Sequence, residues 1–209
     1  EQLVGDERII GSRVRHKPKL SLPMSKSWGY LDPSVTIDHT DYFLQDYTPV
    51  DNHISRTIPI YEIDAALFFD KKSIFSQDWF SEDPQSMFTL NSLRHSLEPR
   101  AYYVYSKSVD QDDLPNFDST LPSFNYQRLF TAYRFSGGDR VGDNNRLTLG
   151  FTSRWTDMSS GQDKAVFSLG QIYHYNNRVV NINGDGQSGR SDSILASEII
   201  LRPFKGVEL

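Results

Sequence analysis

The stretch RLTLGFTSRWT, residues 146–156, decides the fold class of this chain. Apolar and polar side chains alternate along it, the apolar ones being Leu147, Leu149, Phe151 and Trp155 and the polar ones Arg146, Thr148, Thr152 and Arg154. A period of two is the repeat of a β-strand whose two faces meet different environments. The stretch is longer than the typical globular strand of about 5–6 residues and matches the roughly 9–11 residues of a tilted membrane strand. It therefore predicts a strand with an apolar surrounding on one side and a polar one on the other.

Period two recurs along the rest of the chain. The other predicted strands are residues 10–22, 30–44, 58–70, 93–105, 164–175 and 193–201, of which 30–44 and 193–201 alternate least clearly. We therefore expect an all-β chain that forms a segment of an antiparallel transmembrane β-barrel, with about seven strands of a larger barrel. Residues 1–209 are expected to be one partial barrel domain without a separate second domain.

The composition fits such a wall. The chain has 209 residues, of which 37% are hydrophobic, and its mean hydropathy is −0.53. No window approaches the roughly 18 apolar residues of a membrane helix, whereas barrel strands are half polar. The net charge of −5 gives no support to a nucleic-acid partner. The chain has no Cys, which excludes disulfides and thiolate metal sites.

The connections between the predicted strands differ in length. Residues 23–29 and 158–163 are short, whereas residues 46–56, 106–144 and 176–192 are longer. Outer-membrane barrels alternate short periplasmic turns with long external loops. The connection at 72–86 is long where this alternation expects a short turn, but the other connections favour a barrel over a soluble sandwich.

A search for catalytic and cofactor motifs predicts neither an enzyme nor a cofactor. Gly184, Gly186 and Gly189 match the G-x-G-x-x-G pattern, but no helix follows them, as a dinucleotide site requires. The five His residues lack metal-ligand spacing, and the chain has no G-x-S-x-G nucleophile motif. Glu62 and Glu98 keep open a carboxylate-based hydrolase, which would lose activity when either is changed.

Several short motifs follow one another in the second half of the chain. They are LEPR at 97–100, YYVY at 102–105, DQ at 110–111, LPNFDS at 114–119, RFSGGDR at 134–140, NRLT at 145–148, TSR at 152–154 and GQIY at 170–173. Their order resembles the C-terminal barrel of the LptD family, the outer-membrane lipopolysaccharide-assembly proteins, also called organic-solvent-tolerance proteins. The strong resemblance covers about residues 93–180, and residues 17–69 are similar more loosely.

The resemblance implies a function and its partners. The family's barrel is large, follows a periplasmic jelly roll, and is plugged by an LptE-like lipoprotein. Lipopolysaccharide arrives from periplasmic bridge proteins and leaves through a lateral gate into the outer leaflet of the outer membrane of a Gram-negative bacterium. This chain would be a mid-barrel section without the jelly roll, the family's cysteines or the gate strands. It is then a non-enzymatic part of the translocon.

The polar strand faces supply the candidate site residues. We expect these side chains to line the lumen: Arg13, Arg15, Lys17, Lys19, Glu62, Asp64, Arg94, Glu98, Arg100, Arg146 and Arg154. Asp139 and Arg140 match the family's loop motif and are expected to form a structural ion pair or loop lock. The four cations at 13–19 share one strand face. They either help to hold the plug or the phosphates of the glycolipid, or they pair with luminal carboxylates.

A soluble alternative remains open at this point. A secreted β-sandwich that binds carbohydrate would bury one apolar face of each strand against a second sheet and bind through its long loops. Such a chain would be monomeric without detergent, whereas an open barrel segment would expose unpaired strand edges and be insoluble alone.

Overall fold

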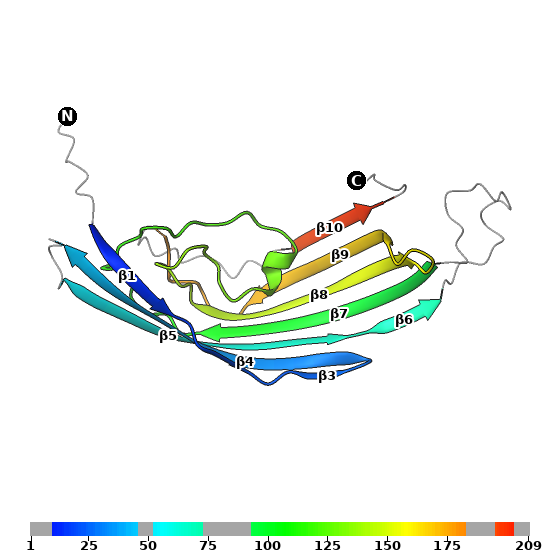
Figure 1. Ribbon diagram of the computed structural model, residues 1–209, viewed down its shortest axis with the longest axis horizontal. Coiled ribbons are helices and arrows are strands. Elements are labelled where there is room, and N and C mark those ends of the chain that lie inside the picture. The colour runs from blue at the N-terminus through cyan, green and yellow to red at the C-terminus, as the bar shows by residue number, and fades with distance from the viewer. Residues whose placement is uncertain (1–9, 46–51, 73–92, 183–194, 203–209) are drawn as a thin grey trace, which may run out of the picture.

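In the computed structural model the described residues form one curved antiparallel sheet of ten strands (Figure 1). The structure describes residues 10–45, 52–72, 93–182 and 195–202. The strands are β1 (Ile10–His16), β2 (Lys19–Ser21), β3 (Met24–Lys26), β4 (Gly29–Gln45), β5 (His53–Leu67), β6 (Phe69–Lys72), β7 (Leu93–Ser106), β8 (Asn144–Asp157), β9 (Asp163–His174) and β10 (Leu195–Leu201), with a short 3₁₀ helix, η3, at Gln127–Phe130. Among the described residues, no helix is long and apolar enough to cross a membrane.

The ten strands make seven positions across the sheet. Their order is β1-β4-β5-β7-β8-β9-β10, with β2 and β3 also on β4 and β6 also on β7. Pro18 and Pro23 lie in the two breaks between β1, β2 and β3, because proline has no N–H to donate to the ladder. The carbonyl of Pro18 still accepts the N–H of Ile37 at 3.0 Å across the break. The predicted antiparallel all-β fold with about seven strands is confirmed, and Gly184, Gly186 and Gly189 lie outside the described residues.

The alternation of the sequence becomes two unlike faces. The convex face carries exposed apolar side chains from neighbouring strands, among them Leu31, Ile37, Tyr61, Ile63, Leu97, Leu149, Tyr173 and Ile199. The residues between them turn to the concave face, where register aligns them across strands, as in the Glu62↔Val104↔Arg146 row. Since the side-chain period is two, the pairing register of a strand determines which face each of its side chains occupies.

A long segment fills the hollow of the sheet. Residues 107–143, here called the inner loop, leave β7 and fold back over the concave face before β8 begins (Figure 1). The buried core lies between the two, with Ile58, Ile60, Tyr102 and Val104 from the sheet and Leu129, Phe130, Ala132 and Val141 from the inner loop. The sequence pattern predicted a long external loop here. The loop lies inside the hollow of the sheet because the concave faces of β5 and β7 are apolar near one strand end. Covering these side chains removes apolar surface from water, which is favourable.

Two glycines make room for η3. Gly150 and Gly170 face each other in the β8–β9 register. A Cβ at Gly170 would lie 2.6 Å from Leu129 Cδ1 and 3.2 Å from Tyr126 Cε2, and a Cβ at Gly150 would lie 2.8 Å from Phe130 Cζ. Because these two positions lack side chains, η3 packs directly against the sheet there, and we call this place the seat of η3.

Filling that seat is expected to loosen the inner loop. Gly170→Val places methyl groups where Leu129 packs, and such overpacking costs about 1–3 kcal/mol. Trypsin should then cleave after Arg128, within η3, faster than in the parent protein. Gly142→Ala is the matched control, because its Cβ would meet nothing closer than Arg134 Cβ at 3.4 Å. Equal cleavage rates in the two variants would contradict this role of Gly170.

Candidate functional site: the concave face and its inner loop

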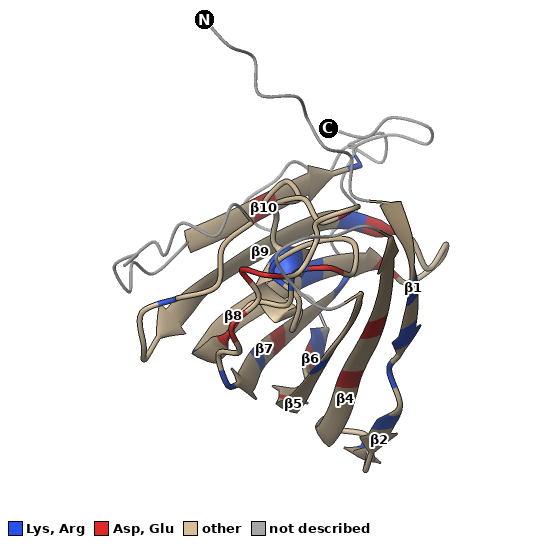
Figure 2. Cartoon of the chain, turned by 90° about the vertical axis from the view of Figure 1, so that its left-hand side faces the viewer, with Lys and Arg blue, Asp and Glu red and all other residues tan. Residues whose placement is uncertain are grey.

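The arginines of β1, the edge strand nearest the N-terminus, lie beside aspartates of the neighbouring strand β4. In Figure 2 the arginines of β1 form blue bands beside the red aspartate bands of β4. Arg15 forms a two-pronged ion pair with Asp38, with Nε–Oδ1 at 2.9 Å and Nη2–Oδ2 at 2.5 Å, and its Nη1 donates to the Gly137 carbonyl at 2.9 Å. Asp38 is fully buried, and a planar fork of this kind gives a strong pair.

Arg13 lies two residues before Arg15 on β1, so both side chains lie on the same face of the strand. Its Nη1 lies 2.9 Å from Asp118 Oδ1 and 2.5 Å from Asp139 Oδ1, and its Nη2 lies 2.8 Å from Asp118 Oδ2. Hydrogen bonds from Arg13 and from the Gly138 N–H hold the pKa of Asp118 well below its ordinary value of 3.8. This contact therefore stabilises the folded state above pH 3.8 and is lost as the pH falls toward the lowered pKa.

Asp139 is the centre of the contact between loop and sheet. Its side chain is fully buried and accepts hydrogen bonds from Arg13, from the Tyr42 hydroxyl at 3.1 Å, and from the N–H groups of Phe117 and Asp118 at 2.7 and 2.8 Å. A buried carboxylate needs such a full set of donors. Asp139 thereby joins β1, β4 and two parts of the inner loop.

Arg140 binds within the loop instead of pairing with Asp139. Its Nη2 donates to the Leu114 carbonyl at 2.8 Å, and its N–H donates to Ser119 Oγ, also at 2.8 Å. The hydroxyl of Ser119 accepts the Asp139 N–H as well, at 3.0 Å. Neighbours in sequence thus turn to different partners, and in the described part of the chain the ion pair of Asp139 is with Arg13.

Arg56 is a buried cation that the sequence pattern did not single out. It is 3% exposed. Its guanidinium donates to Gln111 Oε1 at 2.9 Å, to the carbonyls of Asp139 and Gly138 at 2.5 and 3.0 Å, and to Thr40 Oγ1 at 3.3 Å. Asp38 lies 3.6 Å from Nη2. Arg56 therefore holds the loop backbone from β5, as Arg15 does from β1 through the Gly137 carbonyl.

The two glycines of the loop motif allow this close approach. Gly137 has a φ of +78°, and a Cβ there would lie 2.4 Å from the Asp118 carbonyl oxygen. A Cβ at Gly138 would lie 2.8 Å from Arg15 Nη1. At Gly137 both the positive φ and the contact with backbone require glycine, and at Gly138 a side chain would displace the guanidinium of Arg15.

A second group of charged side chains lies toward the other end of the strands. Arg100 forks onto Asp64, with Nε–Oδ1 at 2.9 Å and Nη2–Oδ2 at 2.5 Å, and lies 4.2 Å from the centre of the Phe130 ring. Glu62 accepts the Tyr102 hydroxyl at 2.7 Å and Lys19 Nζ at 3.3 Å. These pairs cross strands, because neighbouring strands are closer than residues i and i+2.

The remaining candidates are more scattered. Lys17 lies 4.8 Å from the centre of the Tyr133 ring, Arg154 pairs with Asp163 at 2.6 Å, and Arg94 pairs with Asp70 at 4.0 Å. Glu98 lines a hollow of about 550 Å³ together with Arg100 and Arg154. Arg146 is buried, and its Nη2 donates to the Thr131 carbonyl of the inner loop.

Of the two possibilities for the cations at 13–19, the structure shows carboxylate partners for three. Arg13, Arg15 and Lys19 all pair with acids of this chain. The sequence pattern missed Asp38, Arg56 and Gln111 as members of the site. Asp38 and Arg56 do stand at polar-face positions of their strands, which was the one available signal.

The chain is similar over nearly all its length to one family of proteins. The family model described as "LptD: LPS transport system D" matches residues 5–209. The LPS-assembly protein LptD of Hahella chejuensis is 44% identical over 200 residues, which cover 95% of this chain and 23% of that protein. Its counterpart in Marinobacter nauticus is 41% identical over 210 residues, covering 100% and 25%. The LPS-assembly protein LptD of Pseudomonas aeruginosa UCBPP-PA14 is 38% identical over 193 residues, which cover 87% of this chain and 19% of that protein. The chain thus spans about a quarter of the length of the curated relatives it matches.

Proposed function

This chain belongs to the LptD family, and from that premise we propose that it forms part of the wall of an outer-membrane barrel that carries lipopolysaccharide to the outer leaflet. The barrel lies in the outer membrane of a Gram-negative bacterium. The segment acts by shape and charge, without catalysis. Its convex face meets lipid and its concave face, with the lumen-lining candidates, meets the lumen.

One observation carries the proposal: the two faces of a single sheet have opposite chemistry. Apolar side chains such as Leu149 and Ile199 are 44% and 62% exposed on the convex face. On the concave face, charged side chains such as Arg13, Arg15 and Arg100 form ion pairs. A soluble sandwich would bury its apolar face against a second sheet. Lipid is the surrounding that satisfies an apolar outer face, and in the complete barrel further strands would pair the edges that β1 and β10 leave open here.

The hollow around Glu98 suits a lipoprotein plug. Its charged lining includes Arg100, Arg154, Asp163 and Glu198, so both signs are present. A polar plug surface would find donors and acceptors there without burying a lone charge. We assign this part of the concave face to an LptE-like partner, and the inner loop to the closure of the opposite end.

Crosslinking tests the assignment of the faces. A photoreactive residue is placed at Glu98, on the concave face, or at Leu97, its neighbour on the convex face, in a complete family protein that carries this segment. We expect adducts with lipopolysaccharide or the lipoprotein from position 98 and with neither from position 97. Depletion of the protein should in parallel stop new lipopolysaccharide from reaching the cell surface. Adducts from position 97 alone would overturn the assignment.

A charge on the convex face is expected to be costly. Leu149→Arg puts a guanidinium into the lipid-facing band, where such a change costs about 2–4 kcal/mol. Asn145→Arg is the matched control, on the same face of β8 but at its end, where the cost is about 0–1 kcal/mol. The measurement is the denaturant midpoint of the protein folded into lipid vesicles. Equal midpoints would show that this face does not meet lipid.

A further inference from the structure

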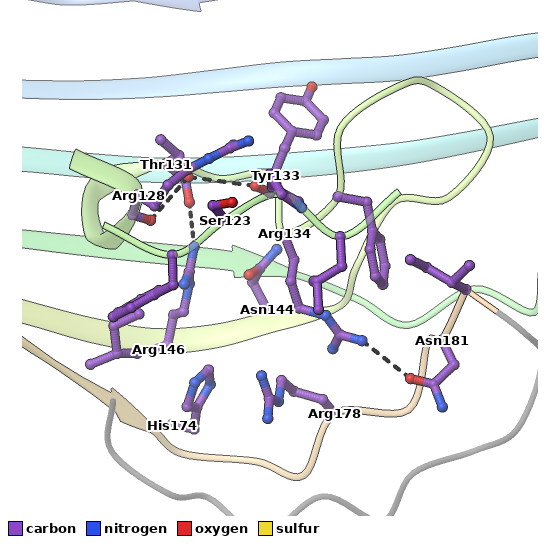
Figure 3. A pocket seen from close by; sticks show the side chains of 16 residues that line it. Ser123, Arg128, Thr131, Tyr133, Arg134, Asn144, Arg146, His174, Arg178 and Asn181 are labelled. Carbon is purple, nitrogen blue, oxygen red and sulfur yellow. Dashed lines mark hydrogen bonds between the residues drawn. The ribbon is translucent and has the colours of Figure 1, made fainter. Parts of the chain in front are cut away.

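A cavity of about 660 Å³ lies between the inner loop and the strand ends of β8 and β9 (Figure 3). The segment after β9, residues 178–182, closes one side of it. Part of the wall is apolar and aromatic, formed by Leu121, Pro122, Phe124, Tyr133, Phe135, Ile172 and Ile182. It is separate from the Arg13–Asp139 contact and from the hollow around Glu98, whose linings are different residues.

Cations gather in this cavity without carboxylates among its lining residues. Arg134, Arg146 and Arg178 line it together with His174, and Arg128 adds a fourth guanidinium. Figure 3 shows Arg134, His174 and Arg178 turned toward the same part of the cavity. None of the sixteen lining residues is acidic. Elsewhere on this face, Arg13, Arg15, Arg100 and Arg154 each pair with an aspartate. The arginines of the cavity differ, because no acidic residue lines it.

Asp143 is the acid whose charge acts on the cavity, and its carboxylate is already hydrogen-bonded to backbone N–H groups. Asp143 acts on Arg134 through its charge, but its two carboxylate oxygens accept the N–H of Val179 at 3.0 and 3.1 Å, and Oδ1 also accepts that of Val180 at 3.0 Å. One carboxylate bound to backbone N–H groups does not neutralise three guanidiniums.

Some nitrogen atoms of the lining side chains are buried without a hydrogen-bond partner among the described residues. Arg134 gives Nη2 to the Val180 carbonyl at 2.8 Å, and Arg146 gives Nη2 to the Thr131 carbonyl. Arg146 is only 6% exposed, and its Nε and the Nε2 of His174 are buried without a hydrogen-bond partner in the described structure. Burial lowers the pKa of Arg134, and the nearby charge of Arg178 lowers it further. Buried polar groups in such a state cost free energy unless a ligand pairs with them.

We propose that this cavity binds a phosphate group, carried on a sugar-sized molecule or as the free ion. Guanidinium forks match phosphate oxygens in pairs, and three of them suit a dianion better than a single carboxylate. The volume exceeds the need of a bare ion, and the aromatic rings offer faces on which the C–H groups of a sugar pack. The inference rests on the proposed function and deepens it, because it names the cavity in which the phosphate of a phosphorylated saccharide would bind.

Direct binding measurements test it. Inorganic phosphate, glucose 1-phosphate and glucose are each titrated by calorimetry into a complete family protein carrying this segment, purified in detergent. We expect both phosphates to bind and glucose not to bind. Arg178→Gln should weaken phosphate binding at least tenfold, and Arg178→Lys, which keeps the charge without the fork, should weaken it less. Lys164→Gln removes a cation from the opposite end of β9 and should change nothing.

Each outcome decides the matter. Tighter binding of the sugar phosphate identifies a phosphorylated saccharide as the occupant, and equal binding identifies the free ion. No phosphate binding by the parent protein, or binding that Arg178→Gln leaves intact, overturns the proposal. If Arg178→Gln unfolds the barrel, as judged by its circular dichroism, the comparison of Arg178→Lys with the parent protein decides in the same way. Surface lipopolysaccharide is measured separately, so a failure here leaves the proposed function standing.

Discussion

Replacing Asp139 with asparagine is expected to release the inner loop from the sheet. The carboxylate is fully buried and receives four donors, Arg13, Tyr42 and the N–H groups of Phe117 and Asp118. Losing charge-assisted hydrogen bonds to a buried carboxylate costs about 1.5–3 kcal/mol, although Arg13 keeps its pair with Asp118. An asparagine also brings an NH₂ to a place where every neighbour is a donor. Trypsin should then cleave the loop at Arg128 and Arg134 while the strands stay resistant.

Asp118→Asn is the matched control for this change. Asp118 binds the same arginine from the same loop, but its side chain is 44% exposed. An exposed pair is worth roughly 0–1 kcal/mol, so cleavage should rise little. If both variants open the loop to the same extent, burial of Asp139 is not what holds it.

Arg56→Met is the second change with a large expected effect. Methionine keeps much of the apolar stem but removes the donors to Gln111 and to the carbonyls of Gly138 and Asp139. Asp38 is fully buried, and of the ion pairs that the described residues give it, the one with Arg15 remains. We expect a loss of about 3 kcal/mol or more in the free energy of loop opening. Hydrogen exchange followed by mass spectrometry should show residues 107–143 about a hundredfold less protected, at 1.4 kcal/mol for each factor of ten.

A control and a coupling test make this sharper. Arg154→Met removes an arginine whose side chain is 35% exposed and whose partner is Asp163, and it should leave loop protection unchanged. The double variant of Arg56→Met and Asp139→Asn should lose less than the sum of the single losses, because both residues hold the same turn of the loop. Additive losses would show that the two contacts act independently.

Parts of the fold follow from local pattern. The strand at 144–157 was predicted as 146–156, and that at 93–106 as 93–105. The alternation also separated Ile63 and Leu149, which are exposed on the convex face, from Glu62 and Arg146, which turn inward. A two-residue period needs no knowledge of the rest of the chain, since the pleat itself sends successive side chains to opposite faces.

The pattern was less informative where the inner face is apolar. Ile58, Ile60 and Val104 stand on the concave face, where alternation alone predicted polar side chains. They are explained by the inner loop, whose Leu129 and Phe130 cover them. Alternation shows that two faces differ, but it does not say what will cover each of them.

The alternation in the amino-acid sequence predicts the strands and the face that each side chain takes, because both depend on near neighbours and on the pleat. The partners on the concave face depend instead on contacts between distant parts of the folded chain. Arg13 meets Asp118 and Asp139 across 105 and 126 residues, and Arg56 meets the backbone of the Gly138–Asp139 turn from β5. These contacts exist because a 37-residue loop folds into the hollow of the sheet, and its path is set by burial of apolar groups and pairing of charges over the whole chain.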